Sequence, residues 1–336
     1  MMKAVNILFR YDDALLPNMM AWAYMFTAYI LGFIALVAQP LWINILGVVF
    51  LAHAMIIAAY FIHECAHESL FKNSSHNRIF GELLLWVSGS SYSDYQAVKH
   101  KHVRHHMDRA DIVSFDFRTR FQAYPKTLKL IQILEWFYIP ALEVMMHALV
   151  IILPFIKTSR KHLRPRIIIV LVLRIAFFTA LASISPKVLI LYPIAYMIFL
   201  TVMRFMDVHQ HTYDLYETLD QEGGDEVKQY DRAFETLNTF SNVLSLKYPW
   251  LNLLVLNFSF HNVHHDQQMQ PWYRLPKLHE KLYAQDKRQV LSFKHLLKSY
   301  HKYRVQRVIN SDPVDMDVHK GKDFIGVDGV SFLTAH

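Results

Sequence analysis

Apolar residues gather in four long segments of the chain. Each is about 20 residues long, which at a rise of 1.5 Å per residue is enough to cross the roughly 30 Å hydrocarbon core of a bilayer. We therefore expect four transmembrane helices, at residues 19–38, 41–62, 166–184 and 187–206. Only Gln39-Pro40 separates the first two segments, and only Ser185-Pro186 separates the last two. Each pair is therefore expected to form a helical hairpin.

A fifth apolar stretch, residues 131–156, is interrupted by four residues that disfavour a span: Glu135, Pro140, Glu143 and His147. A fifth span would also put the histidines after it on the opposite side of the membrane from those before it. We therefore expect an interfacial or re-entrant helix here. In the third apolar segment, Arg174 is expected to face the other helices, because a charge exposed to hydrocarbon is costly.

The polar segments predict the topology. Lys and Arg are frequent in residues 63–165, between the two pairs of apolar segments, whereas the turns within the pairs hold Lys187 and little else. By the positive-inside rule, the central segment and both termini are expected in the cytoplasm. From residue 207 onward the chain is polar, which predicts a cytoplasmic cap of helices. The expected organisation is a cytoplasmic segment 1–18, a membrane domain 19–310 and a tail 311–336 to which no role is assigned.

The composition favours a membrane protein with a large water-facing part. The chain is 53% hydrophobic yet 19% charged, which is too apolar for an ordinary soluble enzyme and too charged for spans alone. Its net charge of +7 does not indicate nucleic-acid binding, because excess Lys and Arg follow from the positive-inside rule and no nucleic-acid-binding motif is present. The single cysteine, Cys65, excludes an internal disulfide, a cysteine-held iron–sulfur cluster and a zinc site of four cysteines.

Histidine spacing carries the strongest chemical signal. The pattern HxxHH occurs twice, and a third cluster, HECAH, precedes both copies. With 20 His in 336 residues, two such copies are expected by chance roughly 0.002 times. On a helix, positions i, i+3 and i+4 share one face, so each box presents its imidazoles, which are common metal ligands, to one point. The box histidines are His63, His67, His102, His105, His106, His261, His264 and His265.

Asp207-Val208-His209-Gln210-His211 adds a fourth source of ligands, in which spacing alone leaves His209 and His211 open as alternatives. With one of them the set reaches nine imidazoles. That is too many for one ion and suits two ions, although spacing does not identify the metal. Asp207 could hold a metal-bound water, and carboxylates near the boxes could orient the imidazoles. By topology, all these histidines fall at one face of the membrane. The expected fold class is therefore an all-α integral membrane protein, with four transmembrane helices in two hairpins and a cytoplasmic helical cap that holds a di-metal site.

The boxes HECAH (63–67), HVRHH (102–106) and HNVHH (261–265), arranged around two pairs of spans, resemble the membrane fatty acid desaturase and hydroxylase superfamily. The similarity covers about residues 20–285. The context of the first box, from Phe61 to Phe71, is similar as well, and the fragment Gln210-His211-Thr212 resembles the family's ligand between the fourth span and the last box. The resemblance therefore favours His211 over His209.

The resemblance implies two iron ions that activate O2, a fatty acyl substrate, and electrons from a separate donor such as ferredoxin and its reductase, since no fused electron-transfer domain is visible. Desaturation is the expected reaction. Fatty acyl hydroxylation and decarboxylation of a free fatty acid to a terminal alkene are alternatives at the same site.

Two other classes of protein are weighed against this one. HECAH also matches HExxH, the zinc protease motif in which Glu64 would be the general base. Two HxxHH boxes have no role in a membrane zinc protease, and a later span offers no clear carboxylate ligand. A metal carrier or sensor without catalysis would be expected to place its histidines within the spans. Neither accounts for the boxes as well as a di-iron oxidase does.

Overall fold

The computed structural model describes residues 8–213, 216–220, 230–283, 289–309 and 331–335. These form two compact units that are interleaved along the chain. Unit 1 comprises Met1–Gln96 and His147–Val202, and unit 2 comprises Ala97–Met146 and Met203–Ala335. Along the sequence, the chain therefore alternates between the units: it begins in unit 1, enters unit 2, returns to unit 1 and then enters unit 2 again.

Four helices are long and apolar enough to cross a membrane, as predicted. They are α2 (Leu15–Val37), α3 (Leu41–Ala66), α9 (Arg164–Ile184) and α10 (Val188–Asp207). The main difference from the predicted spans is that α3 runs on past residue 62 and carries His63 in its last turn. It ends just before Glu68, whose φ of +54° is not helical. The extra turn puts His63 and His67 on one helical face.

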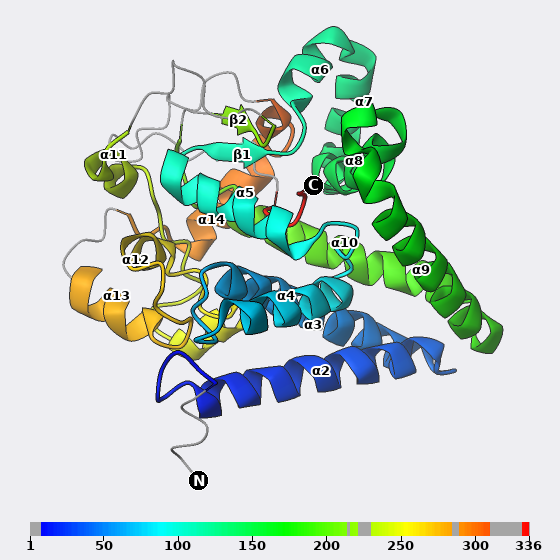
Figure 1. The fold of residues 1–336 in the computed structure, drawn as a ribbon, viewed down its shortest axis with the longest axis horizontal. Coiled ribbons are helices and arrows are strands. Elements are labelled where there is room, and N and C mark those ends of the chain that lie inside the picture. Colours follow the sequence, from blue (N-terminus) through cyan, green and yellow to red (C-terminus); the bar gives the residue numbers. More distant parts are fainter. Residues whose placement is uncertain (1–7, 214–215, 221–229, 284–288, 310–330, 336) are drawn as a thin grey trace. The chain divides into compact units, whose positions relative to one another are not determined.

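Helices α2 and α3 pack side by side in unit 1 (Figure 1). Two glycines, Gly32 and Gly47, allow their close approach. A Cβ on Gly47 would lie 2.7 Å from the Ala35 Cβ and 3.0 Å from the Gly32 carbonyl oxygen. A Cβ on Gly32 would lie 3.0 Å from the Leu51 Cβ. Lipid is as apolar as the helices, so the hydrophobic effect does not drive their association in a membrane. Small residues instead let the two backbones approach closely and pack.

The turns that follow α2 and α9 are tied together by Lys187. Its Nζ donates to the carbonyl oxygens of Ala38 (3.1 Å) and Gln39 (2.8 Å) and to Asn44 Oδ1 (3.2 Å). These bonds satisfy carbonyls that the end of α2 leaves without intrahelical partners. The lone basic residue of the predicted far side thus has a structural role. The arrangement of the spans in two hairpins stays a prediction.

Arg174 faces protein, as expected. Its Nη2 donates to the Trp86 carbonyl oxygen (2.8 Å), and its guanidinium lies 5.5 Å from the centre of the Trp86 ring. Trp86 belongs to α4 (Ser74–Ser88), which also packs against α3. Nearer the start of α9, Arg166 pairs with Glu82 of α4 at 2.7 Å. Arg166 and Arg174 of α9 are thus both held by α4.

Residues 131–156 form no single helix. The stretch is divided between α7 (Pro125–Trp136) and α8 (Ala141–Ile156), which are separated at Phe137–Pro140. At 1.5 Å per residue, the 16 residues of α8 reach about 24 Å, short of the roughly 30 Å core. The two acids that interrupt the apolar pattern are buried in unit 2, where Glu135 pairs with Arg204.

Unit 2 is mostly helical, but the all-α expectation missed one small sheet. Strands β1 (Asp111–Val113) and β2 (Tyr216–Thr218) pair in parallel, with Asp111 opposite Tyr216. The other elements from α5 onward are α5 (Tyr95–Asp108), α6 (Phe117–Ala123), η1 (Thr158–Leu163, in unit 1), α11 (Arg232–Leu237), η2 (Pro249–Val255), α12 (His261–Asp266), α13 (Leu275–Tyr283), α14 (Phe293–Tyr303) and η3 (Gln306–Val308).

We expect Gly47→Ala to lower the free energy of unfolding by about 1–3 kcal/mol, because the added methyl group overpacks the α2–α3 contact. The measurement is the apparent melting temperature in detergent, followed by tryptophan fluorescence. Val49→Ala is the control, because Val49 lies on the same helix and is 55% exposed. Equal melting temperatures for the two variants would contradict the close packing at Gly47.

Candidate metal centre

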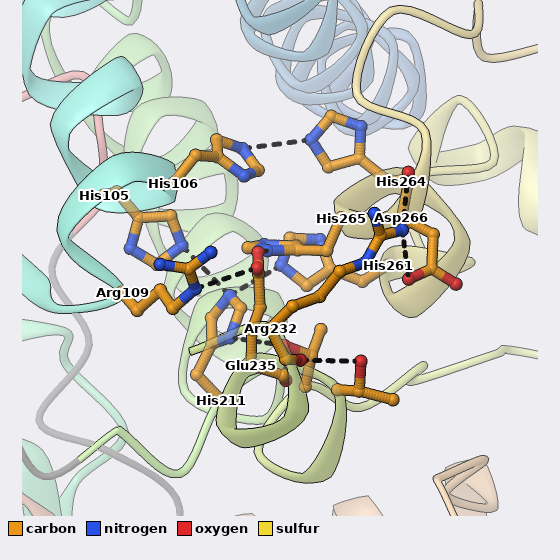
Figure 2. A network of polar contacts seen from close by, with 12 residues as sticks. His105, His106, Arg109, His211, Arg232, Glu235, His261, His264, His265 and Asp266 are labelled. Carbon is orange, nitrogen blue, oxygen red and sulfur yellow. Dashed lines mark hydrogen bonds and ion pairs between the residues drawn. The ribbon is translucent and has the colours of Figure 1, made fainter. Parts of the chain in front are cut away.

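Three elements of unit 2 carry the predicted ligands. Helix α5 presents His102, His105 and His106 on one face, as the spacing of the second box predicts. The six-residue helix α12 carries the third box, and all three of its histidines are buried. His211 lies after α10, in a short extended segment that pairs with Thr239. Residues that are distant along the chain thus turn their imidazoles toward each other (Figure 2).

The first cluster consists of His105, His211, His261 and His265. One ring nitrogen from each lies within 4.8 Å of the others. His211 Nε2 is 2.7 Å from His261 Nε2 and 3.0 Å from His105 Nε2. Four imidazoles around one point match the number of ligands that a tetrahedral metal takes.

The second cluster consists of His102, His106 and His264. His106 Nε2 lies 3.1 Å from His102 Nε2 and 3.3 Å from His264 Nε2. The two clusters adjoin, because the rings of His106 and His265 are 4.2 Å apart. Unit 2 thus brings six box histidines and His211 together in two adjacent clusters.

The remaining predicted pair, His63 and His67, lies in unit 1 at the end of α3. Their ring centroids are 4.7 Å apart, as expected for positions i and i+4. His63 is 1% exposed. The HExxH glutamate, Glu64, is also buried, and its Oε2 accepts a hydrogen bond from Ser69 Oγ (2.7 Å).

The hydrogen bonds of the first cluster fix which nitrogens are available. His105 Nδ1 lies 2.8 Å from the Ala110 carbonyl oxygen, so it carries the proton and leaves a lone pair on Nε2. His265 Nδ1 lies 2.8 Å from Glu235 Oε1, and its buried Nε2 has no hydrogen-bond partner among the described residues. Lone pairs that converge at such distances repel each other unless a cation or proton lies between them. The donor set therefore fits a metal ion.

Glu235 orients His265 and was not identified from the sequence. It lies on α11, accepts from His265 Nδ1, and pairs with Arg109 Nε at 3.1 Å. Burial raises the pKa of Glu235, but the bonds from His265 and Arg109 outweigh this effect, so that its pKa is lowered and the carboxylate stays charged. A carboxylate on the second nitrogen is the usual partner of a metal-bound imidazole. No motif or spacing around Glu235 indicates this role.

Two carboxylates close to the boxes in sequence, Asp108 and Asp266, have other partners. Asp108 pairs with Arg104 at 2.8 Å. Asp266 accepts from the Tyr283 hydroxyl group and lies 3.6 Å from Arg232. The contact that orients His265 therefore comes from a different element of the fold.

Burial keeps the imidazoles of the first cluster neutral. It lowers the pKa of His105 to about 3 and holds the pKa values of His211 and His261 well below 6.5. The pKa of His265 is also lowered by burial, although Glu235 opposes the shift. Neutral imidazole is the form that binds a metal.

His209, the alternative to His211, has a different environment. Its Nδ1 lies 2.9 Å from the Phe205 carbonyl oxygen, and its ring lies near Tyr300. Burial lowers its pKa as well. The first cluster includes His211 and not His209, which agrees with the choice that the resemblance favoured.

A cavity of about 80 Å³ adjoins both clusters within unit 2. Asp207, suggested as the holder of a metal-bound water, lines it, and Asp207 Oδ2 has no hydrogen-bond partner among the described residues. The rest of the wall combines polar side chains, those of Lys101, Asp111, Gln210 and Tyr216, with apolar ones, those of Ile112, Val113, Phe117, Phe258 and Phe332. The cavity thus joins imidazole nitrogens to an apolar surface.

The lowered pKa values predict how the metal-free protein responds to pH. Between pH 6.5 and about 3 the unfolded chain binds more protons than the folded one, so stability falls as pH falls through this window, by up to about 1.4 kcal/mol per pH unit for each such histidine. We expect chelator-treated protein to melt at a lower temperature at pH 5.5 than at pH 7.5. His105→Asn should reduce this difference, and His76→Asn, at an exposed position, should not. A melting temperature independent of pH would contradict the neutral cluster.

Glu235→Gln should lower metal affinity by about 10–100-fold, because the charged partner of His265 Nδ1 is lost. The measurement is a titration of metal-free protein with Fe2+ under anaerobic conditions. Glu217→Gln is the matched control, since Glu217 is also buried and paired, to Arg104 at 2.6 Å. Equal losses of affinity in both variants would show that Glu235 has no specific role.

The comparison with protein families agrees with this geometry. The model of the fatty acid desaturase family matches residues 40–297, which is more than half of the chain and includes all three histidine boxes. Searches of curated proteins and of solved structures found no match. The family match and the four apolar helices together point to a membrane protein. The chain therefore belongs to the fatty acid desaturase family.

Proposed function

We propose that this protein is an O2-dependent di-iron enzyme that introduces a double bond into a fatty acyl chain. The observation that carries the proposal is the gathering of seven histidines, six of them buried and His105 half-buried, from α5, the His211 segment and α12 in two adjacent clusters. Imidazole ligands suit iron, and a single cysteine in the sequence, Cys65, is too few for a cysteine-based site. Family membership favours a fatty acyl substrate.

The proposed ligands are nine histidines, namely the eight histidines of the three boxes and His211. The first cluster would hold one iron and the second cluster the other, with His63 and His67 of α3 completing the set. Asp207 is proposed to act through a bound water. When bound, the irons supply the oxidising power that an unactivated C–H bond requires, while the protein positions the substrate.

The chain's own residues support such a reaction in two ways. Glu235 and the Ala110 carbonyl oxygen keep the Nδ1 protons of His265 and His105, so that their Nε2 lone pairs stay available. The apolar part of the cavity wall suits a methylene chain. The overall reaction takes two hydrogens from the chain and, with O2, two electrons and two protons, releases two waters.

We also propose that both termini and the metal centre face the cytoplasm, as the basic residues of segment 63–165 favour. A separate protein, such as ferredoxin with its reductase, would supply the two electrons from that side. The acyl chain would come from the membrane.

The test combines metal content with product analysis. Protein purified in detergent from iron-supplemented cells is assayed for iron and zinc, then incubated with fatty acids, O2 and a reduced ferredoxin system. We expect about two irons per chain and a product that has lost two hydrogens. Gain of one oxygen would instead assign hydroxylation, and loss of the carboxyl carbon would assign formation of a terminal alkene. One zinc per chain without any lipid product would overturn the proposal and favour a protease.

His105→Ala and His264→Ala remove one nitrogen from each cluster, so both should lower bound iron and abolish product formation. His76→Ala changes an exposed histidine outside the clusters and should do neither. Full iron content and full activity in either cluster variant would remove that residue from the ligand set.

A further inference from the structure

The segment Ser331–Ala335 is folded into unit 2 beside the second histidine box. All of its residues except Phe332 are buried, and Phe332 is half-buried. The Phe332 ring lies 5.6 Å from the His102 ring and lines the cavity that adjoins both clusters. In Figure 1 the red C-terminal segment lies next to α5. Nothing in the local sequence pattern indicates this position.

Two buried charged side chains hold the segment through its backbone. Lys101 Nζ donates to the Ser331 carbonyl oxygen (2.9 Å) and the Thr334 carbonyl oxygen (3.2 Å), and Glu143 Oε2 accepts from the Ser331 N–H (3.0 Å). The Ser114 hydroxyl group donates to the Thr334 carbonyl oxygen as well. Lys101 is 3% exposed and Glu143 is 0% exposed. Hydrogen bonds to buried charged groups are among the strongest in proteins, so Phe332 is held firmly on both sides.

The held ring forms part of the wall of a small cavity. The cavity has a volume of about 80 Å³, which is well below the roughly 150 Å³ of a cavity that binds benzene. A straight methylene chain is narrower than an aromatic ring, and a branch adds width at one carbon. The wall that contains Phe332 therefore distinguishes acyl chains by their width next to the metal-binding histidines.

We propose that Phe332 is a specificity-determining residue, which admits straight acyl chains to the histidine clusters and excludes chains branched near the reacting carbons. Lys101 and Glu143 act as positioning residues that hold the Phe332 segment in place. This inference rests on the proposed acyl substrate.

The test is a binding measurement that requires no turnover. Protein in nanodiscs is loaded with cis-parinaric acid, and its displacement is followed with dodecanoic acid and with a series of methyl-branched dodecanoic acids in which the branch moves along the chain. The same series is offered as coenzyme A thioesters. In the wild type, the straight chain should displace the probe better than those chains whose methyl branch falls within one short range of carbon positions, the range that lies beside Phe332. Phe332→Ala should improve binding of those branched chains about tenfold relative to the straight chain, within the range that a methylene group contributes in an apolar pocket.

Graded and control variants keep the test decisive. Phe332→Leu should give a smaller change in the same direction, and it serves if Phe332→Ala does not fold. Thr334→Val removes the hydroxyl group that lies 3.0 Å from Lys101 Nζ and should shift selectivity in the same direction. Phe293→Ala is the control, because Phe293 is 36% exposed and does not line the cavity.

Unchanged ratios in a Phe332→Ala variant with normal iron content and melting temperature would overturn the inference while leaving the proposed function intact. If the wild type binds neither free acids nor thioesters, the acyl function itself is wrong, and this inference falls with it.

Discussion

Neutral imidazoles that face each other across about 3 Å are the constraint around which unit 2 is built. Hydrogen bonds from His105 and His265 to Ala110 and Glu235 fix the protons on the outer nitrogens, so the inner ones present lone pairs to each other. Such an arrangement is unfavourable by itself. The α12 side of the cluster is held by packing outside it, through the apolar contacts of Phe260 and Val263 with Val243 and Leu275.

The parts that could be predicted from the sequence are those governed by local periodicity or composition. A span needs only a sufficient length of apolar residues, so α2, α3, α9 and α10 lie close to the expected ranges. The HxxHH boxes depend only on the helical repeat, and α5 and α12 are helices at those positions. The position of Arg174 followed from the cost of a charge in lipid.

Features set by tertiary packing could not be predicted from the sequence. Glu235 and the segment that contains Phe332 reach the histidines through contacts between residues far apart in sequence, and neither lies in a repeating pattern. The strands β1 and β2 are three residues each, too short to show an alternation of polar and apolar positions. Asp108 and Asp266, which lie close to the boxes in sequence, have Arg104 and Arg232 near their carboxylates instead of a cluster histidine.

The position of α12 near the end of the chain has a consequence for biosynthesis. The histidines of the first cluster extend along the chain from His105 to His265, and the fourth apolar helix ends at Asp207, well before α12. During translation, all four spans are therefore complete before the last histidines leave the ribosome. In the proposed di-iron enzyme, insertion into the bilayer and capture of metal would thus be separate stages in the life of the chain, and cellular metal supply would act on the second.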